Sequence, residues 1–265
     1  MLNRIDIRSA SPVRQHGFSL LELAIVLLIV GLLLGGLIMP LGSRMDQQRI
    51  ETTRQQLEQI SLALVGYALA HDALPCPATP ASSGQASATA TGCTRQHGFV
   101  PAATLGLPGS RNTDQLLLDA WGNPIRYSVS NSDADGDGNW DFVRPGEMRN
   151  VTLANLAPSL DICSTAAGSS ATACASSATT ITASAPAVIL SLGKDFSSLS
   201  SADELENVGA TLGGGPSGRS YPVANDEVFV SRSISTATGS AFDDLVTWVA
   251  PSTLYGQLVS AGRLP

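Results

Sequence analysis

The sequence predicts an α+β protein in which a long N-terminal helix packs on an antiparallel β-sheet. The first observation is the run over residues 23–39, which has no charged or polar side chain and is typical of a helix within a membrane. The second is a following stretch whose apolar residues recur at helical steps. The third is a set of short β-branched runs without the strand–helix alternation of a parallel sheet. We therefore expect one helix over residues 18–71 and a β-rich head over residues 72–265.

The N-terminal segment combines a basic leader with one acidic residue in an otherwise apolar stretch. Three arginines precede Gly17 and Phe18, and Glu22 lies five residues after Gly17. A carboxylate is costly in such a stretch, which makes Glu22 a functional candidate. Its structural alternative is a helix capping box with Ser19.

This segment resembles the N-terminus of type IV pilins and of the pseudopilins of type II secretion. The resemblance lies in the leader over residues 1–17, in Gly17 and Phe18, in Glu22 as the fifth residue after the leader, and in the apolar helix that follows. It implies cleavage after Gly17 by a prepilin peptidase and methylation of the new Phe18 amine. It also implies that Glu22 pairs with the Phe18 amine of a neighbouring subunit during assembly. An uncleaved signal-anchor with its arginines on the cytoplasmic side is the alternative.

The resemblance also implies a location and partners. We expect a bacterial inner-membrane protein with a single transmembrane helix over residues 18–40 and a C-terminal head in the periplasm. The expected partners are other pilins or pseudopilins, which contact it through the N-terminal helix, together with the prepilin peptidase and the inner membrane itself.

An amphipathic helix is expected over residues 43–71. Its apolar stripe consists of Ile50, Leu57, Ile60, Leu64 and Tyr67. The helix should end before residues 72–77, where two prolines stop it. The stripe then packs on a sheet whose strands are expected at residues 125–129, 188–192, 228–230 and 245–249. Two Ala/Ser/Thr-rich segments, residues 78–94 and 163–186, are expected to be solvent loops.

Residues 119–127 contain Asp119, Trp121, Gly122, Pro124 and Tyr127 in the pattern Asp-x-Trp-Gly-x-Pro-x-x-Tyr. They resemble a stretch of pseudopilins and of some pilins that leads into the sheet. We interpret this segment as a turn between a core tryptophan and a strand.

Four cysteines are expected to form disulfides in an oxidising compartment. Three pairings are possible. We favour Cys76–Cys93 and Cys163–Cys174, because each pair closes a local loop of small polar residues.

An acidic segment is the candidate metal site, with calcium as the candidate cofactor. Its oxygen-bearing residues are Asp133, Asp135, Asp137, Asn139 and Asp141, which resemble the first half of an EF-hand loop. The twelfth position is Arg144, where an EF-hand has a bidentate glutamate, so Glu147 is a candidate to complete the site. A solvated Asp/Gly turn is the alternative.

Composition and motifs argue against several functions. The formal net charge is −7 and the chain has a single lysine, so no nucleic-acid partner is expected. Motifs for a nucleophilic serine, a catalytic zinc site or a phosphate-binding loop are absent from the sequence, so we expect no enzyme and no organic cofactor. The sequence favours a minor pilin or pseudopilin, a structural subunit of a type IV pilus or type II secretion filament. The alternatives are an adhesin or substrate-binding module at a filament tip and an anchored periplasmic domain that never polymerises.

Overall fold

The computed structural model of the protein describes residues 17, 19–196, 199, 201–208, 226–237 and 239–264, without the side chains of residues 34–41 and 43. The predicted leader, apart from Gly17, and the predicted methylation site Phe18 therefore lie outside the described residues. The chain divides into two compact units, Met1–Gln47 and Gln48–Pro265.

A single helix, α1 (Leu20–His71), covers both helical stretches that the sequence predicts. It ends at the predicted place, because Asp72 adopts a φ of 56° and leaves the helical conformation. Among the described residues, no helix has a stretch that is both long and apolar enough to cross a membrane. The predicted span over residues 18–40 includes Phe18 and the side chains of residues 34–40, which lie outside the description, so this span stays a prediction.

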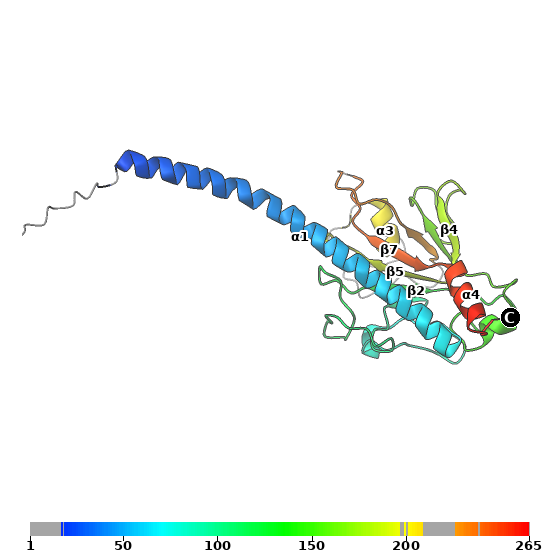
Figure 1. The fold of residues 1–265 in the computed structure, drawn as a ribbon. Helices are drawn as coiled ribbons and strands as arrows, with labels where there is room; N and C mark the ends of the chain where they lie inside the picture. Colours follow the sequence, from blue (N-terminus) through cyan, green and yellow to red (C-terminus); the bar gives the residue numbers. More distant parts are fainter. Residues whose placement is uncertain are drawn as a thin grey trace, which may run out of the picture. The chain divides into compact units, whose positions relative to one another are not determined.

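The larger sheet has four antiparallel strands in the order β1, β2, β5 and β7. Their bounds are His97–Phe99, Arg126–Val129, Ala187–Ser191 and Leu245–Val249. Tyr127 lies opposite Ile189, and Ile189 lies opposite Thr247. The expectation of an N-terminal helix with an antiparallel sheet is therefore confirmed for this part of the head (Figure 1).

A smaller sheet was not expected, and one of its strand pairs is parallel. Its order is β4 (Thr180–Ala185), β3 (Leu160–Cys163) and β6 (Val228–Val230). Strands β3 and β6 run in the same direction, so the prediction that residues 228–230 form a strand of the antiparallel sheet was wrong in its pairing. Parallel neighbours need a long crossover connection, and more than sixty residues separate these two strands in the chain.

The second Ala/Ser/Thr-rich segment is also only partly a loop. Strand β4 occupies its C-terminal part and pairs with β3. The low-complexity composition concealed this strand, although Thr180, Ile181 and Thr182 are β-branched residues that favour extended backbone.

The hydrophobic core forms on both faces of the larger sheet. Leu57, Ile60 and Leu64 of α1 are buried in one cluster with Tyr127 and Ile189, which confirms the central part of the predicted stripe. Tyr67 is half-buried, and Ala68 takes the next core position because it lies four residues after Leu64.

Strand β5 contributes to both clusters, because alternate side chains of a strand point to opposite faces. Its Val188 and Leu190 pack in the second cluster with Leu160, Ile162 and Phe229 of the smaller sheet. Every residue of β5 is buried, so the head is built in layers around this strand.

Short helices complete the head. They are η1 (Pro80–Ser82), α2 (Glu147–Val151), α3 (Ala202–Val208) and α4 (Pro251–Ser260). Leu254 and Leu258 of α4 join the cluster that contains the α1 stripe. Helices α2 and α3 lie next to acidic residues in the chain, and each contributes a glutamate to a group of carboxylates described below.

Candidate functional site

The N-terminal part of α1 presents an apolar surface with one carboxylate. Leu20 is 90% exposed, and the large apolar side chains that follow, through Leu33, are at least 43% exposed. Glu22 lies in the first turn of the helix. The Ser19 hydroxyl accepts a hydrogen bond of 3.2 Å from the Leu21 amide, so Ser19 satisfies one of the amides that a helix leaves unpaired at its start. Continuous exposed apolar surface of this kind marks an interaction with lipid or with other proteins.

The acidic segment folds into a tight loop held by its own carboxylates. Asp133 accepts hydrogen bonds from the amides of Asp137, at 3.1 Å, and Gly138, at 2.9 Å. Asp137 accepts a bond of 2.8 Å from the Asn139 amide. Gly138 has a φ of 87°, a conformation that favours glycine. The segment therefore adopts the sharp turn that the sequence predicted, and the carboxylates of Asp133 and Asp137 bind backbone amides of the same loop.

Two overlapping groups of carboxylates form in this loop. One oxygen each of Asp133, Asp135 and Asp141 lie within 4.8 Å of one another, and so do one oxygen each of Asp135, Asp137 and Glu147. Glu147 thus lies near the loop aspartates, as the sequence suggested, because it is the first residue of α2, which starts six residues after Asp141. An all-oxygen donor set of this kind fits Ca²⁺.

Asp141 is the buried member of the loop. Burial raises the pKa of its carboxyl group above the ordinary value, the Ala134 amide opposes this by hydrogen bonding, and the charges of Asp135 and Asp133 raise the pKa further. A cation among these carboxylates would offset their mutual repulsion and favour the ionised form of Asp141.

The first disulfide supports this loop. Cys76 and Cys93 form one of the two bonds favoured from the sequence. Next to it, the Trp140 amide donates a hydrogen bond of 2.9 Å to the Thr91 carbonyl. A Cβ atom at Gly92 would lie 2.7 Å from the Trp140 ring, so only glycine permits this approach. The disulfide-closed loop therefore packs against the C-terminal end of the acidic segment.

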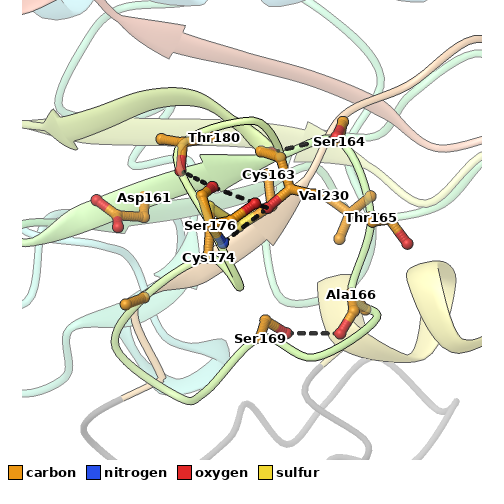
Figure 2. The surroundings of a disulfide bond; sticks show 12 residues. Asp161, Cys163, Ser164, Thr165, Ala166, Ser169, Cys174, Ser176, Thr180 and Val230 are labelled. Atoms are coloured by element: carbon orange, nitrogen blue, oxygen red, sulfur yellow. Dashed lines mark hydrogen bonds between the residues drawn. A yellow bond between two sulfur atoms is a disulfide. The ribbon is translucent and has the colours of Figure 1, made fainter.

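The second disulfide, Cys163–Cys174, is also present. Figure 2 shows the loop that it closes beside β3 and β4. The Thr165 hydroxyl and the Ala166 amide donate hydrogen bonds of 3.0 and 2.8 Å to Asp203. This loop is therefore fastened to α3.

The segment that begins at Asp119 is a structural turn. Asp119 accepts hydrogen bonds from the amides of Trp121 and Asn123 at 2.9 and 2.8 Å and from the Ser191 hydroxyl at 2.5 Å. The Tyr127 hydroxyl donates a bond of 2.9 Å to the Pro75 carbonyl, just beyond the end of α1. Trp121 is half-buried against the main cluster. These contacts fit the predicted turn between a tryptophan and a strand.

A third group of carboxylates was missed by sequence analysis. Asp195, Glu204 and Asp243 come together although they belong to three separate segments of the chain. Several acidic residues follow residue 194 in the sequence. The sequence does not show which of them the fold brings together.

Comparison with known proteins finds a match at the N-terminal part of the chain. No curated protein and no solved structure matches the chain. Residues 13–38 match the family model described as the prokaryotic N-terminal methylation motif, which is the signature of type IV pilins and pseudopilins.

Proposed function

We propose that this chain is a minor pilin or pseudopilin, a structural subunit of a type IV pilus or of a type II secretion filament. The methylation motif over residues 13–38 is the observation that carries the proposal. The exposed apolar surface of α1 supports it, because such a surface needs lipid before assembly and neighbouring helices afterwards. In this proposal the protein is anchored in the inner membrane, with its head in the periplasm, until the filament takes it up.

Glu22 supplies the register of assembly in this proposal. Cleavage after Gly17 creates a cationic amine at Phe18, and an isolated ammonium or carboxylate is costly in an apolar environment. Pairing of Glu22 with the Phe18 amine of the next subunit relieves both costs and fixes the axial offset between parallel helices.

Two measurements test the proposal. Mass spectrometry of protein extracted from membranes should find Phe18 at the N-terminus with one added methyl group. Glu22→Ala should keep the protein in the membrane but exclude it from sheared filaments, whereas Glu51→Ala, on the exposed face of the same helix, should assemble normally. An intact leader in cells with active peptidase, or normal uptake of Glu22→Ala, would refute the proposal.

We also propose that the acidic loop binds Ca²⁺ through Asp133, Asp135, Asp137, Asn139 and Asp141, with Glu147 completing the site. The two carboxylate groups that share Asp135 support this. Such a site would bring residues 133–141 and α2 together without any catalytic role.

The full-length protein in detergent should melt at a higher temperature in millimolar Ca²⁺ than in chelator. Free calcium at 100 times the dissociation constant stabilises a protein by about 2.7 kcal/mol. The double variant Asp135→Asn/Asp137→Asn should lose most of this effect, while Asp114→Asn, outside the loop, should retain it. Mg²⁺ should stabilise less, because it requires stricter octahedral geometry. Equal melting of the double variant and the wild type in calcium would leave the segment as a solvated turn.

A further inference from the structure

Strand β4 forms an open edge of the smaller sheet. It is the terminal strand in the order β4, β3 and β6, and among the described residues only β3 pairs with it. Figure 1 shows β4 at the margin of the head. Along the outer side of a terminal strand, the amides and carbonyls of alternate residues lack a partner in the sheet. With six residues β4 is the longest strand described, so this edge spans about 20 Å.

The side chains of β4 favour pairing with a further strand. Thr180, Ile181 and Thr182 are β-branched and suit extended backbone. Ile181 is 46% exposed, and no other large apolar side chain in a described strand is exposed. Ser184 has a φ of 66°, which interrupts the extended conformation. The part available for regular pairing therefore runs from Thr180 to Ala183.

Contacts on the inner side hold this edge in place. The disulfide between Cys163 and Cys174 joins β3 to the loop that leads into β4. At the start of β4, the Thr180 amide donates a hydrogen bond of 3.1 Å to the Ser176 carbonyl, as Figure 2 shows. A partner strand would therefore meet an edge that is already extended, which lowers the entropy cost of pairing.

The edge of β4 lies in the longest uncharged part of the chain. No charged residue occurs over residues 162–193, whereas the whole chain carries 22 acidic and 15 basic residues. Sheets commonly protect an open edge with charged residues or proline. Charged residues stand next to two other terminal strands: Glu227 and Arg232 lie beside β6, and Asp243 and Asp244 precede β7. Strand β4 lacks this protection.

We propose that β4 pairs with β4 of a second copy of this chain, antiparallel and across a two-fold axis. This occupant fits because an uncharged edge meets an identical uncharged edge, which avoids the repulsion between two acidic heads. Threonine pairs on facing strands add to the attraction. One short strand pair buries less surface than the roughly 1,200–2,000 Å² of a stable complex, so the association is weak and reversible. It does not depend on the filament proposal.

Cysteine cross-linking of the full-length protein in detergent captures a weak pair and locates it. The variants Ile181→Cys, Thr182→Cys and Ala183→Cys are oxidised mildly, one at a time. One of them should give a covalent dimer, because in an antiparallel pair with two-fold symmetry one residue faces its own copy. Peptide mapping should find the new bond between two identical peptides. The matched control is Leu153→Cys, at an apolar residue that is 39% exposed outside the strands, and it should stay monomeric.

A charge on the edge tests the pairing itself. Adding Ile181→Lys to the cysteine variant that cross-links should abolish the dimer, because two like charges then lie on facing strands. Adding Leu153→Lys should leave the dimer unchanged. Where Ile181→Cys is the variant that cross-links, Ala183→Lys serves instead; both positions are exposed, and circular dichroism checks that the sheet still forms. Absence of a dimer from all three cysteine variants overturns the proposal, and so does a dimer that persists with Ile181→Lys or Ala183→Lys.

Discussion

His97 should make the head less stable in acid. The side chain is 2% exposed, and a hydrogen bond of 2.9 Å joins its Nδ1 atom to the Ser128 hydroxyl. Burial lowers the pKa of His97 from 6.5 to about 4, and the positive charge of Arg126 lowers it further in the same direction. Between these two pKa values the unfolded chain binds a proton that the folded chain does not, so stability falls as the pH falls. At pH 5 this linkage costs about 2 kcal/mol relative to pH 7.

The assay compares urea unfolding of the wild type and of His97→Gln at pH 7 and pH 5. The difference in unfolding free energy between them should shrink by about 2 kcal/mol on going to pH 5, because only the wild type loses the histidine contribution. His71→Gln removes an exposed histidine of α1 and serves as the matched control. If the difference between wild type and His97→Gln is the same at both pH values, the assignment of a neutral buried imidazole is wrong.

Three further predictions concern the stability of the head. Burial raises the pKa of Asp226 to about 6, with the charge of Glu227 adding to this, so the folded chain holds a proton that the unfolded chain loses between pH 3.8 and 6. Stability should therefore fall as the pH rises through this window, by about 2–3 kcal/mol, and urea unfolding of Asp226→Asn should lack that slope. Replacing both Cys163 and Cys174 by alanine should destabilise the head by about 3 kcal/mol; equal midpoints before and after reduction of the wild type would argue against this. Tyr127→Phe leaves the Pro75 carbonyl without its donor and should cost about 1–1.5 kcal/mol, measured by urea unfolding against Tyr67→Phe.

The sequence predicted those parts of the fold that depend on local patterns. Helix α1 follows from apolar spacing, and the stripe through Leu57, Ile60 and Leu64 is buried because helical period alone determines which residues share a face. Strands β2, β5, β6 and β7 agree closely with the β-branched runs. Both disulfides agree with the rule of short local loops, since each pair is close in the chain. The acidic loop could be predicted because its candidate ligands lie at alternate positions of one short segment.

The rest depends on contacts between distant segments. Strand β1 is too short to show a pattern, and β4 lies within a segment whose composition is typical of a loop. The parallel pairing of β3 with β6 joins strands that are far apart in the chain. Patterns of neighbouring residues therefore do not predict it. For the same reason the group of Asp195, Glu204 and Asp243 could not be predicted, whereas the position of Glu147 could be suggested from its nearness to the loop.

The distribution of charge explains why carboxylates gather in this head. The chain has 22 acidic residues against 15 basic ones, and Lys194 is its only lysine. Acids that become buried, such as Asp226 and Asp244, therefore have few basic side chains available to neutralise them. A buried carboxylate without a basic partner must take up a proton, accept several hydrogen bonds or bind a cation. Burial raises the pKa values of Asp141, Asp226 and Asp244 and so favours the first solution, whereas calcium would supply the last one at the acidic loop.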